Sequence, residues 1–127
     1  MSPKIIAIFN IAGGVAKSTI AHNLSYHLAK NSKVLTIDMD QQGSLTRFMG
    51  VNPQSLQPQE TVYTSVVNSP DEAPPLPIWQ ESIYGVNLVP GNMTLSSLDE
   101  KIKDSGLDYH AIRLRNAINN LEEEYEY

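Results

Sequence analysis

Two apolar runs and one amphipathic segment dominate the first forty positions of the chain. Residues 4–9 (Lys-Ile-Ile-Ala-Ile-Phe) form a short apolar run without alternation, which is typical of a strand covered on both faces. From Ser18 the apolar residues recur with a helical period, which predicts a helix that ends near residue 31. Residues 34–37 are again apolar and predict a second strand. This order of strand, loop, helix and strand is a βαβ unit, which builds a parallel sheet.

The rest of the chain predicts shorter elements separated by proline-bearing loops. A third strand is expected at residues 85–90. Helices or helical turns are expected at residues 44–49, 61–67, 93–103 and 110–124. Trp79, close to Pro77, is expected to cover an edge of the core. The fold class is therefore α/β, with a parallel sheet and helices on both of its faces.

Length and composition place this fold in a single domain. The chain has 127 residues, nine of them basic and fourteen acidic, and its net charge is −5. It contains no cysteine, which excludes disulfides and thiolate chemistry and fits a reducing compartment. The longest apolar run falls far short of the ~20 residues that span a bilayer. We therefore expect a cytoplasmic domain over residues 1–127, with no membrane segment.

The charge is distributed unevenly along the chain. Residues 1–50 contain five basic and two acidic side chains, whereas residues 51–127 contain four basic and twelve acidic ones. The acidic second half argues against nucleic-acid binding there, and its few basic side chains are expected on solvated helix surfaces: Lys101, Lys103, Arg113 and Arg115. The basic first half suits a compact anion.

The chemically informative segment is residues 10–19 (Asn-Ile-Ala-Gly-Gly-Val-Ala-Lys-Ser-Thr), between the first strand and the first helix. A loop at a helix N-terminus can direct backbone N–H groups toward an anion. Gly13 and Gly14 permit unusual torsions and close approach. Lys17 adds a full positive charge, and the Ser18 hydroxyl suits Mg²⁺. The segment therefore predicts a phosphate site, although the generic P-loop pattern fails at Ile11 and Ala16, where it requires glycine.

Three boxes of the sequence resemble those of the ParA/MinD family of ATPases. The first is the family's deviant Walker A box, x-K-G-G-x-G-K-[ST]-[ST], matched by the glycines at 13 and 14 and by residues 17–19. The second is residues 34–46, which resemble the V-L-h-I-D-x-D-P-Q-G-N/S-x-T box apart from Gln41 in place of the proline. The third is residues 89–92 (Val-Pro-Gly-Asn), which resemble a strand followed by a P-[AGS]-N loop.

The resemblance implies a role for each residue of the first box. Lys17 would bind the β- and γ-phosphates of ATP, Ser18 would ligate Mg²⁺, and Thr19 would reach the α-phosphate. The nucleotide-binding residues would be Gly13, Gly14, Val15, Ala16, Lys17, Ser18 and Thr19.

Two acidic residues at the end of the second strand complete the expected site. The resemblance implies that Asp40 would orient the attacking water and that Asp40 and Lys17 would be the catalytic pair. Asp38 would lie nearer to the metal and would be its second ligand beside Ser18. An ordinary turn carboxylate at the end of a strand is the alternative for Asp38. The carboxyl ends of parallel strands are where α/β sheets place their ligands.

Two positions depart from the family pattern. Ala12 replaces a signature lysine that, in the family, reaches the partner's phosphates in the ATP-bound dimer. The carboxysome-positioning McdA branch resembles this chain in lacking that lysine. Ala16 replaces a glycine. If this position requires a left-handed backbone, alanine costs about 1–2 kcal/mol there.

The resemblance implies a ParA-like ATPase in which ATP drives homodimerisation and hydrolysis reverses it, so that DNA or a large cargo is partitioned or positioned. The partners would be a ParB-like or McdB-like adaptor and non-specific DNA, bound through a later half of the protein. Two alternatives remain: a nucleotide-binding or structural fragment without turnover, and a P-loop metabolic enzyme of the amidoligase type.

The length carries a further expectation, because ParA-like ATPases run about twice as far. The chain is expected to be the amino-terminal half of such a protein, without the Walker B strand that should lie within the sheet. Residues 121–127 (Leu-Glu-Glu-Glu-Tyr-Glu-Tyr) resemble the lead-in to that strand and place three glutamates at the end of the last predicted helix. The edge of the strand at residues 4–9, or of its neighbour, is then expected to be exposed and prone to self-pairing.

Overall fold

The computed structural model describes residues 2–14, 16–68, 71–80, 85–104 and 110–127. Within these ranges the strands are β1 (Leu35–Ile37) and β2 (Asn87–Val89). The helices are α1 (Lys17–Ala29), α2 (Ser44–Phe48), α3 (Val62–Val67), α4 (Leu98–Asp104) and α5 (His110–Asn119). Within the same ranges, 3-10 helices lie at Pro53–Ser55, Pro58–Glu60 and Met93–Ser97.

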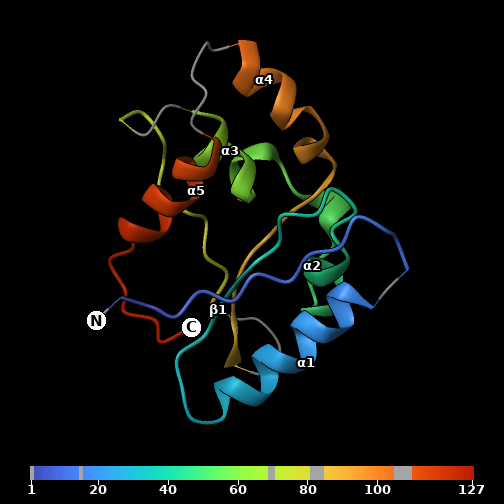
Figure 1. Ribbon diagram of the computed structural model, residues 1–127, viewed down its shortest axis with the longest axis vertical. Helices are drawn as coiled ribbons and strands as arrows, with labels where there is room; N and C mark the ends of the chain where they lie inside the picture. The colour runs from blue at the N-terminus through green and yellow to red at the C-terminus, as the bar shows by residue number, and fades with distance from the viewer. Residues whose placement is uncertain (1, 15, 69–70, 81–84, 105–109) are drawn as a thin grey trace.

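The two strands form a parallel pair at the centre of the molecule (Figure 1). Leu35 pairs with Asn87, and the register continues to Ile37 opposite Val89. The other edge of β2 is covered by Trp79, which exchanges backbone hydrogen bonds of 2.7 and 3.0 Å with Leu88. Trp79 therefore lies at an edge of the sheet, as expected, through its backbone, while its side chain is 37% exposed.

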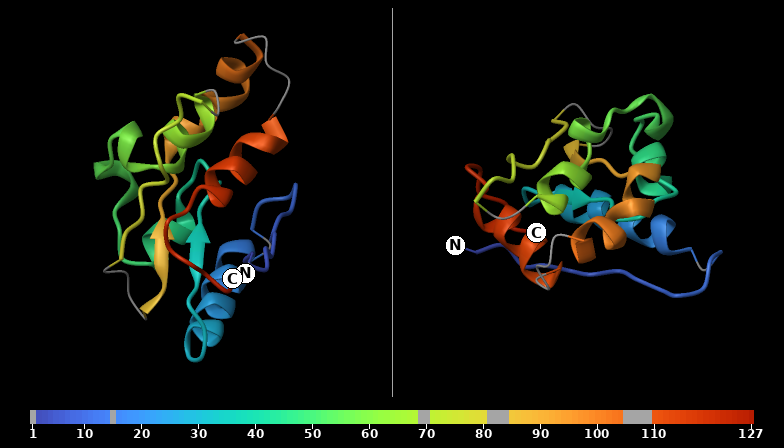
Figure 2. Two further views of the ribbon diagram at one scale, coloured as in Figure 1. Left: turned by 90° about the vertical axis from the view of Figure 1, so that its left-hand side faces the viewer. Right: turned by 90° about the horizontal axis from the view of Figure 1, so that it is seen from above.

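Helices cover both faces of this pair, because successive strand residues face opposite ways. On one face Val34 and Leu88 pack with residues of α1 and α2. On the other face Leu35, Ile37 and Val89 pack with residues of α3 and α5. Figure 2 shows the strands between these two groups of helices. The predicted α/β class, with a parallel sheet between helices, is confirmed.

The prediction of a doubly covered strand at residues 4–9 is wrong in this structure. The segment is extended but forms no strand, and Ile5, Ile6 and Phe9 are 66%, 51% and 84% exposed. A strand needs backbone partners along its length. The backbone hydrogen bond found here is the one from Lys4 N to Glu126 O, at 2.9 Å. Apolar composition alone cannot supply the neighbouring strand.

The last helix is shorter than its sequence pattern predicts. α5 ends at Asn119, and residues 120–127 continue as an extended tail that runs beside the residues leading into β1 (Figure 2). Glu126 N donates to Lys33 O at 2.9 Å, and Leu35 N donates to Tyr127 O at 3.0 Å. The expected opposition between tail glutamates and a helix dipole is therefore absent. Glu123 instead pairs with Lys33 at 2.7 Å.

The helix predicted at residues 93–103 consists of a 3-10 segment followed by α4. The proline-rich region remains irregular where it is described, with residues 69–70 outside the described part. In the described part of the chain, no helix combines the length and apolar character needed to cross a membrane.

Candidate functional site

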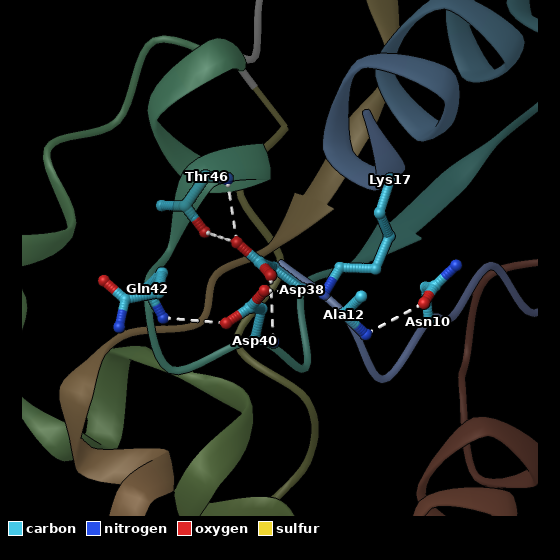
Figure 3. Close-up of polar contacts among 7 residues, drawn as sticks. All are labelled: Asn10, Ala12, Lys17, Asp38, Asp40, Gln42 and Thr46. Carbon is cyan, nitrogen blue, oxygen red and sulfur yellow. Dashed lines mark hydrogen bonds and ion pairs between the residues drawn. The ribbon is translucent and has the colours of Figure 1, made fainter. Parts of the chain in front are cut away.

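The loop before α1 carries the first group of expected site residues. Residues 10–14 are exposed, and Asn10 Oδ1 accepts a hydrogen bond from Ala12 N at 2.9 Å (Figure 3). Gly14 has a positive φ of 74°. Val15, one of the expected nucleotide-binding residues, lies outside the described residues. The loop leaves its backbone accessible at the start of α1, where the first N–H groups of a helix have no partner within the helix.

Ala16 is the N-cap of α1 and adopts the left-handed conformation, with φ 61° and ψ 21°. It is the non-glycine residue with positive φ within the described residues. Its carbonyl accepts the hydrogen bond from Ile20 N that starts the helix, at 2.9 Å. The structure therefore places alanine in the backbone conformation that the family's glycine would adopt without strain.

Lys17 and Asp40 meet at the carboxyl end of β1. Lys17 Nζ lies 2.9 Å from Asp40 Oδ2, and both side chains are partly exposed, at 32% and 27%. The hydrogen bond from Lys17, followed by one from Gln42 N, lowers the pKa of Asp40 below its ordinary value. Asp40 is therefore a carboxylate at neutral pH, held close to a cation. The two residues expected to act as the catalytic pair are neighbours in space, although 23 positions separate them in the sequence.

Asp38 lies behind this pair and is buried, at 3% exposure. Its carboxylate accepts three hydrogen bonds: from Thr46 N at 2.9 Å, from Thr46 Oγ1 at 2.7 Å and from Asp40 N at 3.1 Å (Figure 3). Burial raises the pKa of Asp38, while these donors oppose the shift. Metal ligation by Asp38 stays a prediction. Its contacts favour the alternative that the sequence allowed, a carboxylate that organises the turn after a strand.

The turn from Asp40 to Gly43 connects β1 to α2. Asp40 Oδ1 accepts from Gln42 N at 2.9 Å, and Asp40 O accepts from Gly43 N at 3.0 Å. Gly43 has a φ of 63°, and a Cβ there would lie 2.7 Å from Pro53 Cβ. Both the backbone conformation and the packing therefore require glycine at this position.

The loop after β2 is the third segment that borders the site, beside the loop before α1 and the turn after β1. A Cβ on Gly91 would lie 2.2 Å from Asp38 O, so the two backbones touch. Asn92 is buried, and its Nδ2 donates to Pro53 O and Leu56 O, each at 3.1 Å. The sequence indicated the Val-Pro-Gly-Asn box at residues 89–92 by its resemblance to the family, but it indicated no function for this box. The structure shows that it fixes the loop against Asp38.

A groove of about 670 Å³ runs from this site between residues 4–9 and β1. Four expected site residues line its polar end: Lys17, Ser18, Asp38 and Asp40. The remainder is mostly apolar. Gly13, Gly14 and Thr19 are exposed at the loop and the first turn of α1.

The site offers few protein ligands for a metal ion. No group of three or more His, Asp or Glu side chains is placed to hold one among the residues that the structure describes. This donor set fits Mg²⁺, which typically takes one or two protein ligands and completes its shell with phosphate oxygens and water. Ser18, half-buried and next to Lys17 in sequence, lines the same groove, and its role as a ligand stays a prediction.

Comparisons with known proteins identify the family. A family model described as an AAA domain matches residues 3–127. The chromosome partitioning protein ParA of Myxococcus xanthus is 32% identical over 98% of this chain. The chain belongs to the ParA/MinD ATPases of the AAA-domain family. It spans about half the length of the curated relatives that it matches, 42% in the case of that ParA.

Solved structures match it in the same way. The putative plasmid partition protein of Borrelia burgdorferi bound to AMPPNP has a TM-score of 0.78 and 29% identity, over 100% of this chain and 52% of that protein. Cobyrinic acid a,c-diamide synthase of Mycobacterium smegmatis with ADP and magnesium has a TM-score of 0.77 and 25% identity, over 99% of this chain and 49% of that one. McdA of Cyanothece has a TM-score of 0.69 and 28% identity, over 92% and 44%.

Proposed function

We propose that this chain binds ATP and Mg²⁺ through residues 13–19, and that the complete protein hydrolyses ATP to partition or position DNA or a large cargo. The observation that carries the proposal is the 2.9 Å contact of Lys17 with Asp40. It joins a phosphate-binding lysine to a carboxylate able to orient water, at the strand end where α/β sheets bind ligands. The relatives crystallised with an ATP analogue or with ADP and magnesium support the choice of ligand.

In this proposal several residues of the loop and of the first turn of α1 contact the nucleotide and its Mg²⁺. Backbone N–H groups of Gly13, Gly14, Val15 and Ala16 surround the phosphates, as at other helix N-termini that bind anions. Lys17 neutralises charge on the β- and γ-phosphates. Ser18 ligates Mg²⁺, with Asp38 as the second candidate ligand, and Thr19 donates to the α-phosphate.

Asp40 is the proposed water-orienting residue. An aspartate side chain is ionised at neutral pH with or without the contact from Lys17, so Asp40 can accept a hydrogen bond from the attacking water and hold that water toward the γ-phosphate. Phosphates compete with Asp40 for the hydrogen bonds of Lys17, and we propose that Lys17 turns toward them when nucleotide binds. Nucleotide binding thereby frees the carboxylate that the reaction needs.

At the level of the complete protein we propose a homodimer stabilised by ATP, a ParB-like or McdB-like adaptor, and non-specific DNA as partners. The partition proteins among the relatives support this assignment. Ala12 removes one charged contact from such a dimer, so the interface depends more on contacts made elsewhere. The proposed location is the cytoplasm.

The test compares the complete protein with its Asp40→Ala variant, using a fluorescent ATP analogue and phosphate release. We expect both to bind nucleotide, and only the unsubstituted protein to release phosphate, with stimulation by DNA or a cargo protein. Binding without release in both proteins would support the nucleotide-binding structural role instead. No binding at millimolar ATP would overturn the proposal.

The amidoligase-like reading is the second candidate, favoured by the likeness to the diamide synthase. Such an enzyme would form ADP only when a carboxylate acceptor and an amide donor are both present. Phosphate release that needs neither, and that responds to DNA, would exclude it.

A further inference from the structure

Thr46 connects three segments around the proposed catalytic carboxylate. It lies in the first turns of α2 and is fully buried, at 0% exposure. Its hydroxyl donates to Asp38 Oδ2 at 2.7 Å and accepts from Gly91 N at 3.0 Å. Its backbone N–H donates to the same Asp38 oxygen at 2.9 Å. One side chain therefore joins the end of β1, the start of α2 and the loop after β2.

The connection reaches Asp40 through the other oxygen of Asp38. Asp38 Oδ1 accepts from Asp40 N at 3.1 Å, which fixes the backbone from which the Asp40 side chain extends. The contact of Gly91 with Asp38 O leaves no space for this strand end to shift toward the loop. The Asp40 carboxylate itself is bonded by Lys17 Nζ and Gln42 N, each at 2.9 Å, whereas the buried neighbours hold the backbone that carries it. Its position depends on these buried neighbours.

We propose that Asp38 and Thr46 are positioning residues that set the location of Asp40 for ATP hydrolysis, an inference that rests on the proposed function. Displacement of a reacting group by about 1 Å can cost on the order of 100-fold in rate. Phosphoryl transfer is especially sensitive, because it depends mainly on positioning and charge. Loss of the Thr46 hydroxyl also leaves buried donor and acceptor groups on Asp38 and Gly91 without their partner.

The experiment measures the hydrolysis rate and nucleotide affinity of Thr46→Val in the complete protein. We expect a fall in kcat of roughly 10- to 100-fold with unchanged nucleotide affinity, because Lys17 and Ser18 are untouched. Thr46→Ser retains the hydroxyl and should restore most of the rate. Thr61→Val is the matched control: Thr61 is equally buried, and its hydroxyl bonds Pro58 O and Tyr63 N, away from Asp40. Its kcat should stay within about twofold of the unsubstituted value.

A double-mutant cycle separates positioning from general destabilisation. If Thr46 acts through Asp40, Thr46→Val should cause no further loss of rate in an Asp40→Asn background. Additive losses, or an unchanged kcat for Thr46→Val alone, would overturn the inference. No hydrolysis by the unsubstituted protein would overturn the proposed function, and the inference with it.

Asp38→Asn provides a second route if Thr46→Val does not fold. A positioning role predicts a lower kcat with an unchanged Mg²⁺ concentration for half-maximal activity. A metal ligand predicts a large increase in that concentration instead, and this result would contradict the inference. The Mg²⁺ titration therefore distinguishes the two roles of Asp38 within one variant.

Discussion

The Ala16 side chain introduces backbone strain into the loop that is proposed to bind nucleotide. The residue caps α1 in a left-handed conformation that glycine adopts freely and alanine adopts at a cost of about 1–2 kcal/mol. The first residue of the helix is Lys17, so any relaxation of the Ala16 backbone would move the lysine that is expected to bind phosphate. The strain therefore lies in the backbone that determines the position of Lys17.

Replacing Ala16 with glycine should relieve that strain. We expect Ala16→Gly to raise the free energy of unfolding by about 1 kcal/mol, since the greater freedom of glycine in the unfolded chain offsets part of the gain. Nucleotide affinity should rise by up to about tenfold. Urea unfolding and titration with a fluorescent ATP analogue measure the two effects. Ala21→Gly, in the interior of α1, is the control and should destabilise instead.

The ion pair of Asp40 predicts a pH dependence with a defined sign. The pKa of Asp40 is lowered in the folded state, mainly by the hydrogen bond from Lys17, from an ordinary value of 3.8. Its contribution to stability is therefore fully present above that value and is lost as the pH falls through the lowered pKa. The difference in unfolding free energy between the unsubstituted chain and Asp40→Asn should shrink on acidification below about pH 4.

Urea unfolding at a series of pH values measures this difference. The same comparison in a Lys17→Met background is the control, and there the pH dependence should largely disappear. A difference that stays constant down to acidic pH in the presence of Lys17 would contradict the assignment of the ion pair.

At the scale of elements, the carboxyl end of α3 is capped by a side chain of α5, a helix that lies far from it in the sequence. Arg113 of α5 is buried, at 2% exposure, and its Nη1 donates to three carbonyl oxygens at the end of α3: Val66 at 3.3 Å, Val67 at 2.6 Å and Asn68 at 2.9 Å. The last carbonyls of a helix lack partners within the helix, so a cation there satisfies them and complements the dipole. The expected solvated position of Arg113 is therefore wrong.

Removal of this guanidinium should destabilise the chain. We expect Arg113→Leu to lower the free energy of unfolding by about 2 kcal/mol, because buried carbonyl groups lose a charged donor. Arg115→Leu is the matched control on the same helix, at an exposed position, and should change stability by less than about 0.5 kcal/mol. Thermal and urea unfolding compare the two. Equal effects of both variants would contradict the capping role.

The elements that the sequence located correctly are those with a clear local pattern. The apolar runs at residues 34–37 and 85–90 are found as β1 and β2, because each has the other as its partner strand. The helical period that begins at Ser18 depends on neighbours in sequence, and the helix is found as α1. The strand at residues 4–9 failed because strand formation requires a distant partner. Arg113 failed for the same reason, since its partners are 45 to 47 positions away.

The site, like the fold, was predictable where the sequence carries a recognisable pattern and not where it depends on long-range contacts. The boxes that resemble those of the ParA/MinD family located Lys17 and Asp40, and the structure brings these two residues together. The link from Thr46 to Gly91 spans 45 positions and carries no periodic signal, so only the folded chain shows it.

At the scale of the whole molecule, the groove beside β1 leaves an apolar surface open. Ile5, Ile6 and Phe9 are more than half exposed along one side of it. Exposed apolar side chains on an extended backbone favour association with other chains. The expected exposure of this edge is found at residues 4–9, as an extended segment rather than as a strand.

Residues 1–127 alone should therefore self-associate. We expect sedimentation velocity to show growing oligomers as concentration rises, and the double variant Ile5→Lys/Ile6→Lys to shift the protein toward monomer. The double variant Gln54→Lys/Asn119→Lys adds the same charge at exposed positions outside the groove. It should leave self-association nearly unchanged. A monomer at all concentrations for the unsubstituted chain would contradict this prediction.

The pairing of Trp79 with Leu88 has a practical consequence for optical measurements. Trp79 is the single tryptophan of the chain, and its neighbour Gln80 donates to Glu123 in the carboxyl-terminal tail at 2.7 Å. Strand β2 and its partner β1 stand between this indole and the turn that carries Asp40. Intrinsic fluorescence will therefore report on the docking of the sheet edge and the tail, whereas events at the phosphate loop need an introduced fluorophore.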